Sequence, residues 1–279
     1  MKDFKDKVLV VTGAGSGIGS AIAKEGALRG MKVVLNDIDS EGVNRTLEEI
    51  KKMGGEGVTQ CADISLLENV QALYDLTMNT YGRVDILVNN AGVSVSGPVW
   101  EIPIQDIRWI TEVNLLSHTY GMNVFLPKMI EQGTEAAVVN VASTAGVMIS
   151  PNAVMYHATK FADIAQTEST SLALKARGIN NIQMHALCPA FVQTTIHESD
   201  KHRPERYADL SDDYYKSQEF KAGYIRSARQ VLGGIPIDSV GLTVFTALED
   251  NKFYIWTHPE SIIPASQRLG NMVNGRNPA

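Results

Sequence analysis

The sequence predicts a doubly wound α/β fold, in which helices cover both faces of a parallel sheet. Two observations predict it. Short runs of β-branched residues alternate along the chain with longer amphipathic segments, in the order βαβαβα. The short runs are almost entirely apolar, which indicates strands buried on both faces and connected by right-handed helical crossovers.

The individual elements follow from their patterns. Strands are expected at 8–11, 32–35, 57–61, 86–89, 137–141 and 182–187, with a last one at 253–256. Apolar residues at spacings of three and four predict helices at 17–29, 41–53 and 66–81. Ser65 with Glu68 is typical of a capping box, so Ser65 is expected to start the third of these helices.

Composition limits the class of protein. The chain has 279 residues, of which 44% are hydrophobic, and no linker or repeat divides it, so we expect residues 1–279 to form one domain. A net charge of −6 disfavours nucleic acid and anionic membranes as partners and leaves small molecules. With two cysteines and no signal peptide, a cytoplasmic protein is expected. The histidines lack metal-ligand spacing, so no metal is expected.

The glycine-rich motif at 12–19 reads Thr-Gly-Ala-Gly-Ser-Gly-Ile-Gly. It follows the first strand and opens the first helix, so backbone N–H groups and a helix N-terminus can face a pyrophosphate. The spacing of Gly13, Gly17 and Gly19 differs from the G-x-G-x-x-G fingerprint. A tight turn without a ligand is the alternative.

Asp37 lies at the end of the second strand, 18 residues beyond Gly19. An acid there can accept hydrogen bonds from the adenosine ribose and would repel a 2′-phosphate. No arginine or lysine lies within 13–19, at Asn36 or at Ile38 to receive that phosphate. The sequence therefore predicts NAD rather than NADP, and the alternative is an ordinary turn acid.

Tyr156 and Lys160 are four residues apart and so share one face of a helix. A nearby cation favours the ionised form of a phenol, which lets the tyrosine exchange a proton with an alcohol or a carbonyl. Taken alone, the same spacing also fits an exposed helical pair.

From its start to about residue 195, the chain resembles the short-chain dehydrogenase/reductase family. The motifs that carry the resemblance are the turn at 12–19, Asn89-Asn90-Ala91-Gly92, Ser143, and Tyr156 with Lys160; Asp63, Ile64 and Asn114 also match. The resemblance implies a Rossmann-type sheet and an oxidoreductase that uses a nicotinamide cofactor.

The resemblance also implies a role for each matched residue. Tyr156 would be the general acid/base, Lys160 would hold the nicotinamide ribose, and Ser143 would orient the substrate oxygen. Asn114 would anchor a water of the proton relay. The residues expected to bind NAD are Gly13, Ser16, Gly17, Ile18, Gly19, Asp37, Asp63, Ile64, Asn90, Ala91, Gly92, Tyr156, Lys160, Pro189, Val192 and Thr194.

The sequence departs from the family pattern at two places. Pro189-Ala190 stands where the family has Pro-Gly, which predicts a slightly tighter nicotinamide pocket. The glycine-rich C-terminal ending is replaced by residues 253–259 and a polar tail, so the family's tetramer contacts are not assumed. The small and apolar face of the segment 155–177 still predicts a homo-oligomer, either a dimer or a tetramer.

Residues 193–236 are expected to form a helical lid over the substrate. Its rings, set among basic residues, predict a bulky apolar alcohol with a polar or anionic tail; otherwise they pack on the body. These rings are Tyr207, Tyr214, Tyr215, Phe220 and Tyr224. An apolar wall is expected from Val93, Met148, Met155 and Phe191.

These features favour an NAD-dependent enzyme that interconverts a secondary alcohol and a ketone on a hydroxysteroid, bile acids included. An aryl secondary alcohol of the lignin type is an alternative. A catalytically silent NAD(H) sensor would not need Ser143, Tyr156, Lys160 and Asn114 together. A reductase of carrier-bound oxoacyl groups would favour NADP, against which Asp37 argues.

Overall fold

A computed structural model describes residues 1–278 and contains a seven-stranded sheet in the order β3-β2-β1-β4-β5-β6-β7, with every neighbouring pair parallel. The Rossmann-type doubly wound sheet expected from the sequence is thus confirmed. The strands are β1 (Val8–Thr12), β2 (Lys32–Asp37), β3 (Glu56–Cys61), β4 (Ile86–Asn89), β5 (Ala136–Val141), β6 (Ile182–Cys188) and β7 (Tyr254–Trp256).

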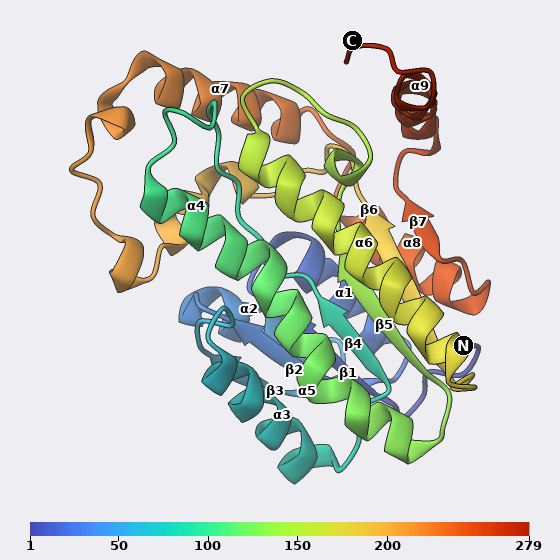
Figure 1. The fold of residues 1–279 in the computed structure, drawn as a ribbon. Helices are drawn as coiled ribbons and strands as arrows, with labels where there is room; N and C mark the ends of the chain where they lie inside the picture. Colours follow the sequence, from blue (N-terminus) through green and yellow to red (C-terminus); the bar gives the residue numbers. More distant parts are fainter. Residues whose placement is uncertain (279) are drawn as a thin grey trace.

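Helices cover both faces of this sheet, with α1, α2 and α8 on one face and α3, α5 and α6 on the other (Figure 1). The helices are α1 (Gly17–Leu28), α2 (Ser40–Lys52), α3 (Leu67–Tyr81), α4 (Ile104–Thr111), α5 (Ser117–Gln132), α6 (Val154–Ala176), α7 (Gln218–Leu232), α8 (Asp238–Glu249) and α9 (Ile262–Val273).

Strand β1 illustrates why the sheet is covered on both sides. All of its residues are buried, and successive side chains point to opposite faces. Leu9 and Val11 pack into the apolar cluster under α1 and α8, whereas Val8 and Val10 pack into the one under α3 and α5. Apolar residues at four successive positions therefore fit a central strand that is buried on both faces.

The start of α3 corrects one expectation. Ser65 does not cap this helix, because α3 begins at Leu67 and its N-cap residue is Leu66. The Ser65 hydroxyl donates instead to the Asp63 carboxylate at 2.7 Å, and the Ser65 N–H donates to the same oxygen at 3.0 Å. This local turn competes with the capping box for the serine side chain.

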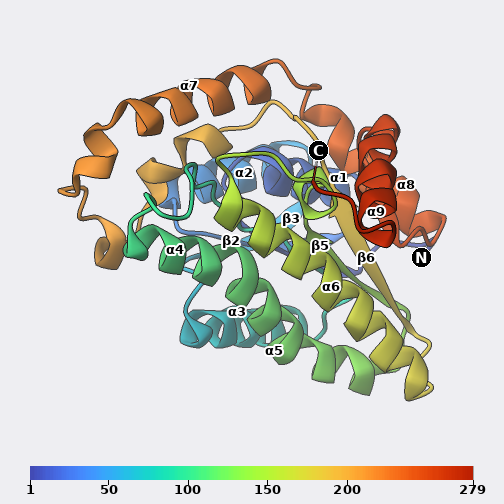
Figure 2. The same cartoon turned by 45° about the horizontal axis from the view of Figure 1, so that its top comes forward.

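The segment 193–236 is helical, as expected, and ends in α7, which passes over the carboxyl ends of the strands (Figure 2). The helices α8 and α9 were not predicted from the sequence pattern. In place of a polar tail, α9 carries exposed apolar side chains such as Ile263 and Val273. Among residues 1–278, none of the helices combines the length and apolar character needed to cross a membrane.

Candidate active site

A cavity of about 650 Å³ lies where the carboxyl ends of the strands meet the lid segment, residues 193–236. Every residue expected to bind NAD lines it except Gly19. Gly19 packs beneath the turn, where an added Cβ would collide with the carbonyl oxygen of Gly13. Gly15 also lines the cavity, although the sequence analysis did not select it.

The glycine turn leaves the start of α1 open toward this cavity. Gly17 has a φ of +53°, which favours glycine, and Ser16 at the N-cap makes no side-chain capping bond. The first N–H groups of a helix need acceptors, and here no side chain supplies one. The arrangement therefore fits the pyrophosphate of a dinucleotide.

The Asp37 carboxylate is fixed at the cavity by two backbone donors. The Gly15 N–H lies 2.7 Å from Oδ2 and the Asp39 N–H 2.9 Å from Oδ1. Burial raises the pKa of Asp37, and these two hydrogen bonds oppose the increase. A Cβ at position 15 would lie 2.8 Å from Oδ2, so Gly15 is the residue that lets the acid approach the turn. The one signal for this role in the sequence is that Gly15 belongs to the glycine-rich motif at 12–19.

Asn90 holds the next loop against the glycine turn. Its side-chain amide donates to the carbonyl oxygens of Thr12 at 2.8 Å and Gly13 at 2.9 Å, and its N–H donates to the Thr12 hydroxyl at 3.0 Å. Gly92 then lies next to Lys160, since a Cβ at position 92 would be 3.8 Å from Nζ. This loop connects the nucleotide end of the cavity to its catalytic end.

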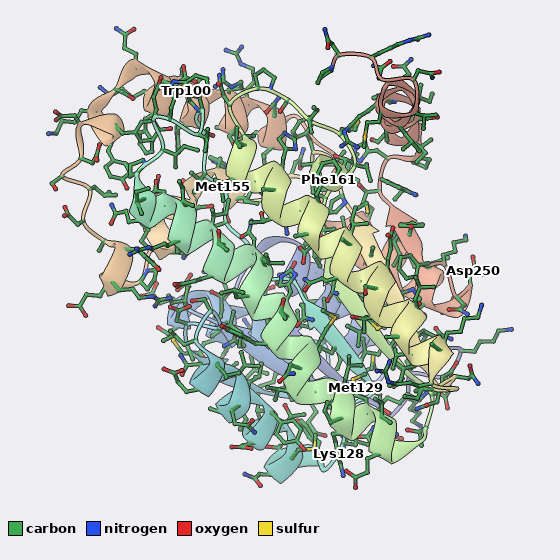
Figure 3. The ribbon with its side chains drawn as sticks, viewed as in Figure 1. Trp100, Lys128, Met129, Met155, Phe161 and Asp250 are labelled. Atoms are coloured by element: carbon green, nitrogen blue, oxygen red, sulfur yellow. The ribbon has the colours of Figure 1, made fainter. Side chains whose placement is uncertain are left out.

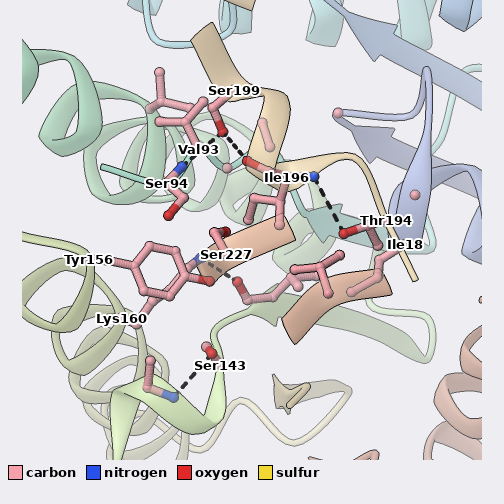
Figure 4. Close-up of a pocket in the computed structure, with 18 of the residues that line it drawn as sticks. Ile18, Val93, Ser94, Ser143, Tyr156, Lys160, Thr194, Ile196, Ser199 and Ser227 are labelled. Atoms are coloured by element: carbon pink, nitrogen blue, oxygen red, sulfur yellow. Dashed lines mark hydrogen bonds between the residues drawn. The ribbon is translucent and has the colours of Figure 1, made fainter. Parts of the chain in front are cut away.

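Ser143, Tyr156 and Lys160 lie together on one side of the cavity (Figure 4). The Ser143 hydroxyl, at the end of β5, accepts from the Ala145 N–H at 3.1 Å and donates to the Pro189 carbonyl at 3.3 Å. Tyr156 and Lys160 are one turn apart on α6, with Nζ 6.0 Å from the centroid of the tyrosine ring. A hydroxyl, a phenol and an ammonium thus face the same space.

Asn114 is placed differently from the other expected catalytic residues. It sits in a π-helical turn, Glu112–Leu116, is fully buried and does not line the cavity. Its side chain accepts from the Val93 N–H at 2.7 Å and donates to the Val93 carbonyl at 2.9 Å. The side chain therefore holds the loop after β4, and the expected role of Asn114 as the anchor of a relay water stays a prediction.

Sequence reasoning missed two side chains behind Lys160. The Lys160 ammonium donates to the Val141 carbonyl at 2.8 Å and to Asp163 Oδ2 at 3.2 Å. The other oxygen of Asp163 lies 2.9 Å from His118 Nδ1. The pairing of His118 with Asp163 across 45 residues leaves no local pattern in the sequence.

Three of the five rings in the lid segment lie away from the cavity, against the body. Tyr207, Tyr214 and Tyr215 are buried against the body, where their hydroxyls donate to Glu112, the Ser96 carbonyl and Asp106. None of the five lid rings lines the cavity. The alternative interpretation, in which the rings pack on the body, holds for these three, because buried phenols need partners that the body supplies. Tyr224 stays 44% exposed beside His197.

Apolar and polar side chains together form the remainder of the substrate side. Val93, Met148 and Phe191 line the cavity as expected. Met155 packs instead with the cluster between α4 and α6 (Figure 3). The lid segment contributes one face of α7, formed by Gly223, Arg226, Ser227, Gln230 and Val231. It also contributes residues that precede α7, namely Thr194, Thr195, Ile196, Ser199, His202 and Pro204.

Two arginines attach the lid segment to the body. Arg203 donates to both oxygens of Asp106, at 2.7 and 3.1 Å, and lies 4.2 Å above the ring of Trp109. Both charged side chains of this pair are almost fully buried. Arg206 bridges Asp63 and Glu112, so the carboxylate expected near the adenine also contacts the lid.

Comparison with known proteins agrees with this geometry. The family model for short chain dehydrogenase matches residues 7–205. A CLA biosynthesis dehydrogenase/reductase of Lactiplantibacillus plantarum is 44% identical over 93% of this chain and 91% of its own. Identities of 31% and 32% are found with a C alpha-dehydrogenase of Sphingobium sp. (93% and 83% covered) and 3beta-hydroxysteroid dehydrogenase 1 of Eggerthella lenta (82% and 85% covered).

Among solved structures, a short chain dehydrogenase/reductase from Burkholderia phymatum, in complex with NAD, superposes with a TM-score of 0.96. It is 35% identical, and the match covers 100% of this chain and 98% of that one. The fold, the motifs and their placement around one cavity therefore have a common explanation: this chain is an enzyme of the short-chain dehydrogenase/reductase family.

Proposed function

We propose that this enzyme interconverts a secondary alcohol and a ketone with NAD, using Tyr156 as the general acid/base. The observation that carries the proposal is one cavity with two distinct ends. Ser143, Tyr156 and Lys160 line one end, and the carboxylate of Asp37 faces the other. A nucleotide that reaches from Asp37 toward Tyr156 would place its reactive ring beside the phenol.

Each side chain has a task in that reaction. When bound, the nicotinamide ring would supply the hydride chemistry at the substrate carbon. Tyr156 accepts the proton from the alcohol, or donates it to the ketone, and the Lys160 ammonium favours the ionised phenol. The Ser143 hydroxyl can turn from the Pro189 carbonyl to the substrate oxygen and hold it beside Tyr156.

Asp37 supports NAD over NADP. Its carboxylate can accept from the ribose hydroxyls, and it would repel a 2′-phosphate in a partly buried site of low dielectric. The Burkholderia relative was solved with NAD. Burial of Asp37 makes the repulsion stronger than it would be in water.

Arg226 supports an apolar substrate that carries an anion. The acidic residues that line the cavity, Asp37, Asp39 and Asp63, follow β2 and β3 on the nucleotide side. Arg226 lines it from α7, beside Ser227 and Gln230. Its only ion pair among the described residues is with Glu219 at 3.2 Å, and both side chains are substantially exposed. Such a pair contributes little, so a substrate carboxylate can replace Glu219.

This description fits bile acids among the hydroxysteroids, which the sequence analysis favoured. It also fits hydroxy fatty acids. We include this class because one relative is named a CLA biosynthesis dehydrogenase/reductase. Aryl secondary alcohols without an acid fit the apolar wall but leave Arg226 unused. We therefore rank acid-bearing apolar alcohols first.

The test is NADH formation with matched substrates, each offered as the free acid and as its methyl ester. Wild-type enzyme should have a KM several-fold lower for the acid, and Arg226→Ala should raise that KM roughly tenfold while leaving the ester unchanged. Arg229→Ala, on the same helix but outside the cavity lining, is the control. Equal KM values for acid and ester in the wild type would rule out the anionic tail and leave the neutral alcohols.

Self-association stays a prediction. The helix α6 presents exposed Leu172 and Val154, in keeping with the expected dimer or tetramer. Sedimentation or light scattering measures the mass directly, and a monomer at enzyme concentrations used in assays would contradict the expectation.

A further inference from the structure

Lys160, Asp163 and His118 form a chain of contacting side chains behind the catalytic end of the cavity. The proposed reaction gives a task to Lys160 but none to Asp163 or His118. Lys160 Nζ is 3.2 Å from Asp163 Oδ2, and Asp163 Oδ1 is 2.9 Å from His118 Nδ1. His118 Nε2 is 3.0 Å from the carbonyl oxygen of Ala91, in the loop after β4. Asp163 and His118 are both 0% exposed.

The charges in this chain can be counted from its hydrogen bonds. The Ala91 carbonyl is an acceptor, so His118 Nε2 carries a proton. A further proton lies between Nδ1 and Asp163, so the histidine and the carboxylate together are neutral. Burial acts to raise the pKa of Asp163, but the charges of His118 and Lys160 outweigh it and hold this pKa below its ordinary value. Asp163 is therefore the anionic side of this pair.

The other groups around Lys160 do not change this balance. Burial raises the pKa of Cys188 to about 12, so that thiol is neutral. Gln166 donates to Asp163 Oδ1 at 2.7 Å and carries no charge. Tyr156 faces Lys160 from the next turn of α6. The ammonium of Lys160 is thus the one net charge that the cluster presents to the phenol.

We propose that Asp163 and His118 are positioning residues for Lys160: Asp163 fixes the ammonium at the cavity, and His118 neutralises Asp163 and joins it to the loop that carries Gly92. The proposal rests on the proposed function, since it assigns Lys160 to the cofactor and to Tyr156. Without His118, the Asp163 carboxylate would offset the Lys160 charge that favours the ionised phenol. Without Asp163, the ammonium would lose one of its two anchors.

The test compares Asp163→Asn, His118→Gln and the double variant. In His118→Gln the unpaired carboxylate disfavours the phenolate, so the acidic limb of kcat/KM for alcohol oxidation should move up by about one pH unit. The double variant removes the carboxylate as well and should return that limb to its wild-type position. A purely structural role for His118 predicts no such recovery, because the second substitution would only add damage.

NADH binding gives a readout that does not depend on turnover. Asp163→Asn should weaken NADH binding, measured by fluorescence, roughly tenfold because Lys160 loses a charged hydrogen-bond partner. Glu131→Gln removes an exposed carboxylate from α5 and is the matched control, with no expected effect. If the wild-type enzyme shows no turnover at all, the proposed function is contradicted, but the comparison of NADH affinities still tests the role of Asp163.

Wild-type NADH affinity in folded Asp163→Asn, or an acidic limb that His118→Gln leaves in place, would overturn the proposal. Circular dichroism establishes folding. Should the buried variants fail to fold, Gln166→Met removes a donor to Asp163 from the half-buried edge of the cluster. It should weaken NADH binding in the same direction by a smaller factor, and unchanged binding there would count against the proposal.

Discussion

The nucleotide side of the cavity and the lid segment differ in which kinds of residue line the cavity. On the nucleotide side, the residues that line the cavity are those with distinctive local roles: glycines in a turn and an acid at a strand end. In the lid segment, three distinctive residues, the buried tyrosines Tyr207, Tyr214 and Tyr215, face the body. Less distinctive residues of α7 and of the segment 194–204 face the cavity instead.

The difference follows from what orients each region. Backbone geometry orients the turn at 12–19, since the end of a parallel strand must lead into a helix there. Contacts between distant residues orient the lid: Arg203 docks on Asp106, 97 residues earlier, and Tyr215 donates to the same carboxylate. Local rules therefore suffice for the first region and not for the second.

The largest expected effect comes from a substitution of Tyr156, the proposed general acid/base. Tyr156→Phe removes the proton that is exchanged with the substrate and should lower kcat by about a thousandfold. The affinity for NADH should remain close to that of the wild type, because the nucleotide side is untouched. Steady-state kinetics and fluorescence titration measure the two quantities. Normal turnover in this variant would remove Tyr156 from the mechanism.

The next largest effect is expected when the lid segment, residues 193–236, is loosened from the body while the nucleotide side stays unchanged. Asp106→Asn keeps the shape of the side chain but removes the buried, bidentate counter-charge of Arg203 and leaves only the more exposed Asp200. We expect substrate KM to rise roughly tenfold and protease cleavage within 193–236 to accelerate. NADH affinity should not change. An equal loss of NADH affinity and substrate affinity would show that the two regions are not separable in this way.

A smaller effect acts on the nucleotide side alone. Asp37→Ala should reduce the preference for NAD over NADP by about tenfold or more, because it removes a ribose acceptor and a charge that repels phosphate. Glu41→Ala, an exposed acid in the first turn of α2, is the control. An unchanged ratio of kcat/KM values would mean that other residues distinguish the two cofactors.

The smallest effect is the dependence of NAD binding on pH. Because burial raises the pKa of Asp37, its carboxylate takes up a proton at a higher pH than an exposed aspartate does. NAD affinity should therefore fall as the pH is lowered through that pKa, and Asp37→Asn should remove this dependence. Titrations at a series of pH values check it, and a flat wild-type profile across the acidic range would contradict the assignment.

Much of the fold could be predicted because periodicity determines it. The fourth strand was placed at 86–89, as observed, and the other five of the first six lie within two residues of their expected ends. Ser65 was misassigned because the neighbouring Asp63 competes for its hydroxyl. The helix α9 was missed because its polar residues, such as Arg268 and Asn271, hid its apolar face.

The candidate site divides along the same line. Asp37, Ser143 and Tyr156 could be selected because motif and position after a strand identify them. His118 could not, since its partner Asp163 lies 45 residues away. Asp163 is three residues from Lys160, but that spacing alone does not distinguish it from an ordinary helical ion pair. Arg226 was also missed, because only the docked orientation of α7 decides which of its side chains meet the cavity.

The most direct test of the account is the initial rate of NADH or NADPH formation by the wild-type enzyme with a panel of bile acids, hydroxy fatty acids and aryl secondary alcohols. The account predicts turnover with NAD, a much lower kcat/KM with NADP, and a preference for the acid-bearing alcohols. Turnover with NADP alone would contradict the role given to Asp37, and silence across the panel despite NADH binding would favour a sensor over an alcohol dehydrogenase.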